Sequence, residues 1–173
     1  MINVRLQYAL ETLQAICGHQ FGFRRMRGTE DSLVCVESMI LGAFQRKKHI
    51  VGIFFDIAKA YDTTWRFGIL KKLHNIGIRG NLARFIQNFL SSRSFRVRIN
   101  SALSDPQTQE QGVPQGSVLS CLLFLIAIND IASTIPPMVK PSLYVDDLAI
   151  FIEVTFIDSA QRILQRTVDT ISS

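Results

Sequence analysis

The chain has 173 residues, a length that suits one domain. With 47% hydrophobic and 19% charged residues, its composition excludes a disordered tail and allows a sizeable core. Nineteen Lys and Arg against fourteen Asp and Glu give a net charge of +5, which is compatible with a polyanionic partner but does not require one.

Cysteine usage and hydropathy point to an intracellular protein. The three cysteines are widely spaced and show neither metal-ligand spacing nor a disulfide framework, which fits a reducing compartment. Residues 1–10 lack the apolar segment of a signal peptide, and the longest apolar run, residues 121–128, is too short to span a bilayer. We therefore expect no membrane partner.

The first third of the chain predicts two helices and a strand. Residues 2–16 and 29–47 carry apolar residues at helical spacing, and a glycine-rich basic loop at 19–28 separates them. Residues 49–56, HIVGIFFD, form a nearly continuous apolar run, which predicts a strand buried on both faces. In the second helix, the residues expected to face the core are Leu33, Val36, Ile40, Leu41 and Phe44.

The middle of the chain predicts a helical pair followed by short strands. Two helices are expected near residues 66–76 and 80–92, because glycines interrupt the pattern between them. Residues 94–100 alternate like a half-exposed strand, and residues 108–113 predict a second one.

The last third predicts a helix, a hairpin and a final helix. Residues 114–116, PQG, break the chain before an apolar helix that we expect to run from residue 117 to about residue 134. Residues 142–146 and 148–154 predict a hairpin, and residues 158–171 an amphipathic helix. This order of elements is typical of an α+β fold with a mostly antiparallel sheet.

Two adjacent aspartates, Asp146 and Asp147, lie at the predicted hairpin turn inside an apolar run. Asp is a common turn residue, so the pair by itself carries little weight. However, Asp56 ends another apolar strand, and antiparallel pairing could bring it beside them. Carboxylates about 4 Å apart repel by roughly 4 kcal/mol at an effective dielectric near 20. Oxygen ligands without His or Cys favour Mg²⁺ or Mn²⁺, so the three aspartates predict a metal site for phosphoryl transfer.

The segment GVPQGS, residues 112–117, opens directly into a predicted helix. Its free backbone N–H groups suit an anion or a polar sugar group, and Gly116 permits close backbone approach. An ordinary loop with Ser117 as N-cap is the alternative.

A basic segment follows the first predicted strand. Residues 63–104 carry eight Lys or Arg and no Asp or Glu, which indicates either a solvated face or a surface that follows a phosphate backbone. The complete absence of acid favours nucleic acid. The candidate contact residues are Lys71, Lys72, Arg93, Arg96 and Arg98.

Four segments, in this order and at this spacing, resemble the polymerase core of a reverse transcriptase of the non-LTR, jockey-like type. They are QFGFRRMRGTEDSL (20–33), FFDIAKAYDTTW (54–65), QGVPQGSVLSCLLFLIAINDI (111–131) and YVDD (144–147).

The resemblance implies a right-hand polymerase palm, an antiparallel sheet backed by helices, with part of the fingers. Residues 1–48 would be partial fingers and residues 49–173 a partial palm with a basic helical and strand segment at 66–110, all within one reverse transcriptase domain. The family's first finger motif, primer grip, thumb and endonuclease are expected to lie outside this chain, so that it is truncated at both ends.

The resemblance also implies an enzyme, an RNA-directed DNA polymerase that uses Mg²⁺ or Mn²⁺. Its partners would be an RNA template, a DNA primer and dNTP, in the nucleus and cytoplasm. Asp56, Asp146 and Asp147 match the catalytic, metal-binding carboxylates, and the main-chain carbonyl of Ile57 would help to hold a metal.

Five further residues match the family's substrate-binding positions. Tyr61 matches the aromatic residue that rejects a 2′-hydroxyl on the incoming sugar, and Gln115 and Gly116 match the lining of the nucleotide pocket. Arg24 and Arg27 fall in the finger motif, where they would face template or triphosphate.

Two alternatives remain. A truncated, non-catalytic remnant would keep the palm fold and bind nucleic acid weakly without extending a primer. A different palm-type nucleotidyl transferase, such as a cyclase, would share the carboxylates, although the PQG turn and the sequence FFDIAKAYD around Asp56 argue against it. A Ser-His-Asp hydrolase finds no support, and Walker A and HExxH patterns are missing.

Overall fold

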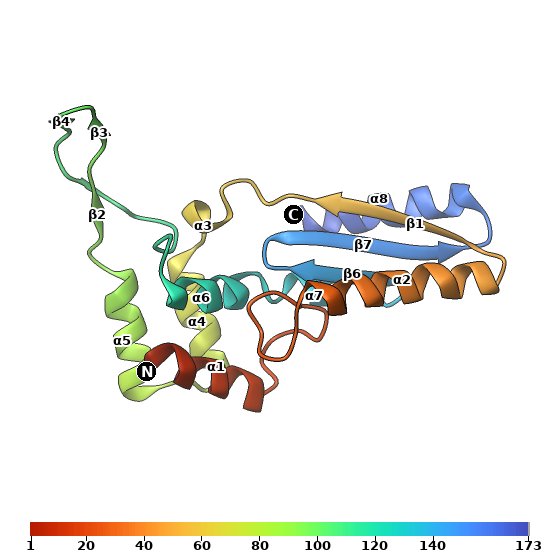
Figure 1. Cartoon of the computed structure of the whole chain (residues 1–173), viewed down its shortest axis with the longest axis horizontal. Helices are drawn as coiled ribbons and strands as arrows, with labels where there is room; N and C mark the ends of the chain where they lie inside the picture. The colour runs from red at the N-terminus through yellow and green to blue at the C-terminus, as the bar shows by residue number, and fades with distance from the viewer. Residues whose placement is uncertain (173) are drawn as a thin grey trace. The chain divides into compact units, whose positions relative to one another are not determined.

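The protein is described by a computed structural model covering residues 1–172 (Figure 1). It contains two compact units, one built from Met1–Ala15 and Lys59–Ala127, the other from Ile16–Ala58 and the chain from Ile128 onward. The units cross the expected boundary between residues 48 and 49, and the assignment of fingers and palm to those ranges stays a prediction.

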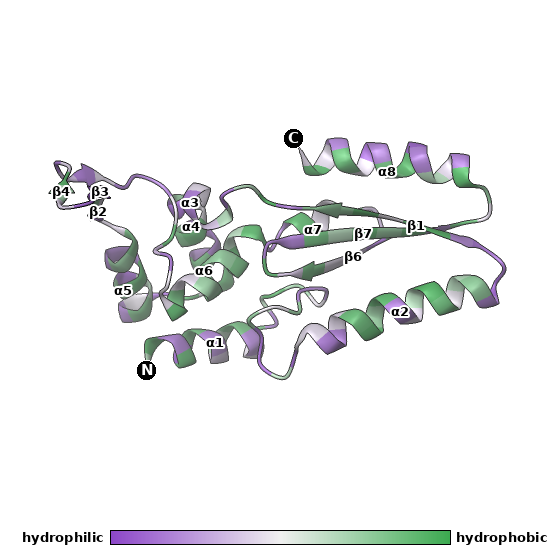
Figure 2. Ribbon diagram, turned by 45° about the horizontal axis from the view of Figure 1, so that its top comes forward, coloured by the Kyte–Doolittle hydropathy of each residue, from purple (hydrophilic) through white to green (hydrophobic). Residues whose placement is uncertain are grey.

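A three-stranded antiparallel sheet organises the second unit. Its central strand β7 (Asp147–Val154) pairs with β1 (His49–Phe55) on one side and with β6 (Val139–Tyr144) on the other. Helices α2 (Thr29–Gln45) and α8 (Ile157–Ile171) lie on opposite faces of this sheet (Figure 2). The predicted α+β class, an antiparallel sheet backed by helices, is therefore confirmed.

The core of this unit lies between the sheet and α8. Strand alternation directs Leu148, Ile150 and Ile152 of β7 to the same face, where each is at most 3% exposed. They pack with Ala160 and Leu164, which α8 presents one helical turn apart. This packing anchors β7, whose first residue is one of the two adjacent aspartates.

Strand β1 is an edge strand and is only half-buried, so the prediction of a strand buried on both faces is wrong. Val51, Ile53 and Phe55 pack against the core, whereas Phe54 is 76% exposed and meets the ring of Phe151 edge-on. A continuous apolar run does not reveal which faces of a strand other elements will cover.

The predicted inward face of α2 is also wrong in part. Leu33, Leu41 and Phe44 are exposed, while Val36 and Ile40 are partly buried. Apolar residues surround most of this helix, so their spacing does not single out the face that meets the sheet.

Helices dominate the first unit. The expected helical pair is present as α4 (Arg66–Ile76) and α5 (Gly80–Leu90), and Gly77 ends α4 with a φ of 93°. The expected apolar helix is present as α6 (Val118–Ile128) and is largely buried. The other helices among residues 1–172 are α1 (Ile2–Thr12), α3 (Ala60–Thr63) and α7 (Ile131–Thr134).

The apolar helix is shorter than expected because the chain breaks at Asn129 and Asp130, before α7 begins. The side chain of Asn129 accepts a hydrogen bond from the Cys17 backbone N–H at 2.7 Å. Asn favours such side-chain to backbone bonding over the helix interior, which accounts for the break.

The predicted strands between α5 and α6 form an exposed hairpin arm. Strand β2 (Ser94–Phe95) pairs with β5 (Gln107–Thr108), and β3 (Arg98–Ile99) pairs with β4 (Ala102–Leu103). The strand expected at residues 108–113 is wrong beyond Thr108, because the following backbone groups bond to other segments of this unit. Within residues 1–172, no helix combines the length and apolarity needed to cross a membrane.

Candidate functional site

The three aspartates meet one end of the sheet in the second unit. The last pair of the β1–β7 ladder is Phe55 with Leu148. One residue further, antiparallel register puts Asp56, directly after β1, opposite Asp147, the first residue of β7. Asp146 lies in the turn that precedes Asp147.

These carboxylates do not form a closed metal-binding cluster. Asp56 and Asp147 are exposed and Asp146 is half-buried. Across residues 1–172, no three His, Cys, Asp or Glu side chains are grouped closely enough to hold a metal ion. The structure thus brings the aspartates to one sheet end without gathering all three around a point.

The turn between β6 and β7 has a strained backbone. Tyr144 pairs with Asp147, so Val145 and Asp146 are the two central residues of the hairpin turn. Val145 has a φ of 59°, and Asp146 is not among the residues with positive φ. A positive φ at the first central residue alone is typical of a type II′ turn, in which glycine is usual. A β-branched residue there is an outlier that costs about 1–3 kcal/mol.

A buried glutamine from the loop before α2 contacts this turn. The Gln20 side chain donates to the Val145 carbonyl at 3.2 Å and accepts from the Val145 N–H at 2.9 Å. Its oxygen also accepts from the Gly22 N–H at 2.9 Å. Gln20 is 3% exposed, so these hydrogen bonds are shielded from water. Gln20 is the first residue of the finger segment 20–33, but no feature of its neighbours in the sequence predicts this contact.

In the first unit, the segments around Tyr61 and the PQG turn are bonded together. The Val113 N–H donates to the Tyr61 carbonyl at 2.7 Å, and the Gly112 N–H donates to the Thr64 carbonyl at 2.9 Å. The half-buried Tyr61 ring stacks on Phe124 with a centroid distance of 4.9 Å.

Glycine is required at position 112, where the two segments touch. Its φ is 80°, and an added Cβ would lie 2.6 Å from the Asp62 carbonyl oxygen and 2.7 Å from that of Tyr61. Gln115 then reaches back, and its side-chain amide donates to the Asp62 carboxylate at 2.9 Å. Gln115 and Gly116 are both exposed.

Arg66, at the start of α4, braces this same loop. Its guanidinium donates to the Gly112 and Gln109 carbonyls at 2.6 Å each and to the Gln111 carbonyl at 2.9 Å. Burial and the nearby positive charge of Arg93 lower its pKa. Arg66 belongs to the acid-free basic segment, yet it contacts protein rather than presenting all its donors to solvent.

A groove of about 800 Å³ runs along this loop within the first unit. Asp62 and Gln115 line it together with Arg93 and Phe95 at the base of the hairpin arm. Two of the residues expected to bind substrate or nucleic acid, Gln115 and Arg93, therefore line one hollow.

The expected finger arginines bond to their own loop. Arg24 donates to the Cys17 carbonyl at 2.9 Å, and Arg27 donates to the carbonyls of Gly18 and, at 3.2 Å, Gln20. These bonds stabilise the loop that holds Gln20. Contact of either arginine with template or triphosphate stays a prediction.

The expected nucleic-acid residues lie on α4, α5's end and the arm. Arg96 and Arg98 are exposed, and Arg93 lies over the Phe89 ring at 5.5 Å. Lys71 is exposed, whereas Lys72 donates to the Ala127 carbonyl at the end of α6. The half-buried Lys72 thus contacts the protein, and its contact with a phosphate stays a prediction, whereas Arg96 and Arg98 of the arm are exposed.

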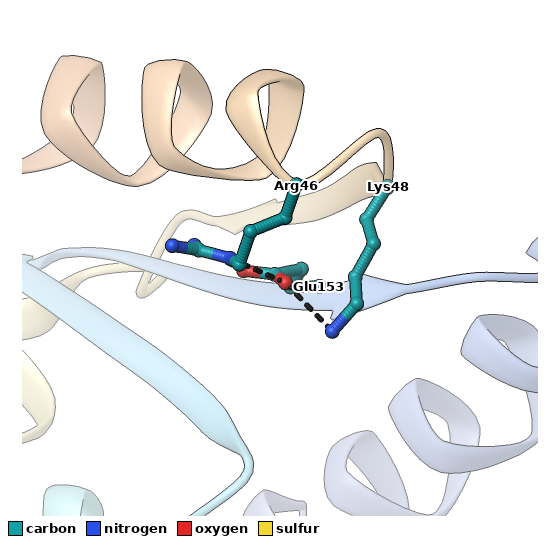
Figure 3. A network of polar contacts seen from close by, with 3 residues as sticks. All are labelled: Arg46, Lys48 and Glu153. Carbon is teal, nitrogen blue, oxygen red and sulfur yellow. Dashed lines mark hydrogen bonds and ion pairs between the residues drawn. The ribbon is translucent and has the colours of Figure 1, made fainter.

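A network of ion pairs lies at the opposite end of the sheet from the aspartates. Glu153 accepts from the Arg46 guanidinium at 2.9 and 2.5 Å and pairs with the Lys48 ammonium at 3.0 Å (Figure 3). The hydrogen bond from Arg46 lowers the pKa of Glu153 most, and Lys48 adds to it, bringing it to about 2. This network ties the end of α2 to β7.

Comparison with known proteins assigns the family. The family described as "Reverse transcriptase (RNA-dependent DNA polymerase)" matches residues 1–173. The chain is 32% identical over 98% of its length to the RNA-directed DNA polymerase from mobile element jockey of Drosophila melanogaster, of which it covers 19%. It is 28% identical over its whole length to the probable RNA-directed DNA polymerase from transposon BS of the same species, of which it covers 20%.

A third relative, the probable RNA-directed DNA polymerase from transposon X-element, is 34% identical over 75% of the chain and is covered over 14% of its length. The chain thus spans about a fifth of the length of the first two relatives. The resemblance to jockey-like elements drawn from the four motifs is confirmed, and the chain belongs to the reverse transcriptase (RNA-dependent DNA polymerase) family.

Proposed function

We propose that this chain is the palm core of an RNA-directed DNA polymerase from a non-LTR, jockey-like retrotransposon. It would transfer a nucleotidyl group from dNTP to the 3′-OH of a DNA primer paired with an RNA template. The observation that supports this most is the strand register at one end of one sheet, where Asp56 follows β1 opposite Asp147, the first residue of β7, with Asp146 in the turn before it.

The proposed metal ligands are the carboxylates of Asp56, Asp146 and Asp147 and the main-chain carbonyl of Ile57. An all-oxygen donor set fits Mg²⁺ or Mn²⁺, and the exposure of Asp56 and Asp147 leaves them accessible to an ion. When bound, such ions stabilise the charge that develops on the attacking and leaving oxygens of phosphoryl transfer.

The other proposed site residues contact the incoming nucleotide or the template. Tyr61 excludes a 2′-hydroxyl by bulk, and its stack on Phe124 fixes the ring that would do so. Gln115 and Gly116 line the pocket for the incoming nucleotide. Arg24 and Arg27 contact template or triphosphate.

The exposed arm and the neighbouring helices supply the nucleic-acid surface. Arg93, Arg96 and Arg98, with Lys71 and Lys72, neutralise phosphates, an interaction that does not depend on base sequence.

A primer-extension assay tests this function. The chain is incubated with an RNA template, an annealed DNA primer, dNTPs and Mg²⁺ or Mn²⁺, alone and joined to the remaining parts of a jockey-like enzyme. Extension should disappear in Asp56→Asn and Asp147→Asn, which remove a charge at constant shape. Asp158→Asn is the matched control, because Asp158 is an exposed aspartate at the start of α8.

Direct titration with Mn²⁺ gives a second measurement that does not need a complete polymerase. Asp56→Asn and Asp147→Asn should each weaken binding at least about tenfold, while Asp158→Asn leaves it unchanged. Salt-sensitive nucleic-acid binding without primer extension, in the joined enzyme as well, would favour the non-catalytic remnant instead.

A further inference from the structure

The backbone of Val145 adopts a conformation that its own side chain disfavours. Val145 has a φ of 59° at the first central position of a two-residue turn. Such a conformation persists only where the surrounding structure holds it. Asp146 and Asp147 directly follow Val145, so the backbone conformation of Val145 determines the positions of both aspartates.

The Gln20 side chain contacts both backbone polar groups of Val145. It donates to the carbonyl at 3.2 Å and accepts from the N–H at 2.9 Å, while the same oxygen accepts from the Gly22 N–H. A two-point contact of this kind fixes the orientation of the peptide groups on each side of Val145, whereas a single hydrogen bond would leave them free to rotate.

The backbone carrying Gln20 is itself fixed to the sheet. The Phe21 N–H donates to the Leu143 carbonyl at 2.9 Å, and the Leu143 N–H donates to the His19 carbonyl at 2.9 Å. Gln20 therefore acts from a loop residue that forms an isolated parallel bridge with Leu143 of β6. A side chain on such a rigid base can restrain a turn.

Gly22 permits the close approach that this contact needs. A Cβ at position 22 would lie 2.4 Å from Cγ2 and 2.6 Å from the backbone nitrogen of Val145. Both distances are shorter than real Cβ contacts, and the second involves backbone that cannot rotate away. Any side chain at this position would push the loop and the turn apart.

We propose that Gln20 is a positioning residue, which holds Val145 in its positive-φ conformation and thereby sets the direction of the Asp146 and Asp147 carboxylates. This rests on the proposed function only in so far as those carboxylates bind the metal. Gln20 touches no reacting atom, and its effect reaches the site through the turn.

The first test measures the contact itself. Gln20→Met keeps the length and burial of the side chain but removes its hydrogen bonds. Amide hydrogen exchange at Val145 and Gly22 should become about tenfold faster, relative to core amides of β7 such as Ile150. Gln161→Ala, an exposed glutamine on α8, is the control and should leave these rates unchanged. Unchanged exchange at Val145 in Gln20→Met would overturn the proposal, whether or not the chain binds metal.

The second test measures the consequence, using Mn²⁺ alone as the probe. Gln20→Met should weaken Mn²⁺ binding about tenfold or more in the folded protein, as loss of an outer supporting residue does. A residue that only fills the core would lower the melting temperature without changing the affinity of the folded fraction. An affinity within twofold of wild type therefore contradicts a positioning role.

A rescue experiment separates backbone strain from packing. Glycine adopts a positive φ without penalty, so Val145→Gly removes the need for a restraint. In the Val145→Gly background, Gln20→Met should change Mn²⁺ affinity by a smaller factor than in wild type. If Gln20→Met does not fold alone, the double variant decides: a folded double variant supports the proposal, and an unfolded one overturns it.

The outcomes distinguish this proposal from the proposed function. Mn²⁺ affinity that Asp147→Asn leaves unchanged would count against the metal site, while accelerated exchange at Val145 in Gln20→Met would still support the restraint. Normal metal binding in Gln20→Met would leave the proposed polymerase function unaffected but would show that Gln20 does not position the metal ligands.

Discussion

Arg66 provides a measurable link between the basic segment and the loop before α6. Its guanidinium bonds to three carbonyls, those of Gln109, Gln111 and Gly112. Replacing it with alanine leaves these acceptors without their donor and frees the loop that carries Gln115. We expect Arg66→Ala to destabilise the first unit.

The magnitude follows from the number and type of bonds. A hydrogen bond to a charged group contributes about 1.5–3 kcal/mol, but three bonds on one guanidinium are not additive, and acceptors near the surface can turn to water. Burial and Arg93 also disfavour the charged form of Arg66, which offsets part of the gain. The expected loss is about 2–4 kcal/mol, or a shift of roughly 1–2 M in the urea midpoint for a slope of about 2 kcal/mol/M.

The single tryptophan makes the assay specific to this unit. Trp65 directly precedes Arg66 and is the only tryptophan in the chain, so its fluorescence during urea unfolding reports on the first unit. Arg84→Ala, an exposed arginine of α5, is the control and should change stability by less than about 0.5 kcal/mol.

Arg66→Lys distinguishes geometry from charge. Lysine keeps the charge but cannot present a planar fork to three carbonyls, so it should lose more than half of the stability lost in Arg66→Ala. A lysine variant as stable as wild type, or an alanine variant as stable as the Arg84→Ala control, would refute the bracing role. Arg66 would then belong with the nucleic-acid surface.

Three further outcomes can be measured independently. The pKa of Glu153 is lowered from its ordinary value of 4.5 to about 2, so its ion pairs stabilise the fold above pH 4.5 and lose this effect as the pH falls through 2. In thermal melts, Glu153→Gln should therefore lie below wild type at pH 7 and converge with it in acid, and a gap that widens in acid would contradict this. Tyr61→Ala in a joined, active enzyme should raise ribonucleotide incorporation relative to deoxynucleotide, whereas Tyr61→Phe should not. Its stack on Phe124 means that Tyr61→Ala also lowers stability, so sugar selectivity and not melting temperature is the deciding measurement. Reversing the charges of Arg93, Arg96 and Arg98 together should flatten the dependence of nucleic-acid affinity on salt, and an unchanged slope in a binding titration would move the contact surface elsewhere.

Local patterns in the sequence determined much of this protein. The helices α4, α5 and α8 follow from apolar spacing and glycine breaks, and the hairpin around Asp146 follows from two apolar runs with a polar turn between them. Even the common sheet end of Asp56 and Asp147 follows from local reasoning, because each residue lies at the end of an apolar strand and neighbouring antiparallel strands share their ends.

Other features depended on which segments meet in space. The pattern of apolar residues did not predict the burial of β1 or the inward face of α2, because other elements decide which face is covered. The bonds of Arg66 to residues 109–112 bridge more than forty positions, and those of Gln20 to Val145 bridge 125. A glutamine or an arginine has no local periodicity that reveals its partner, since its hydrogen bonds are chosen by tertiary packing rather than by its neighbours along the chain.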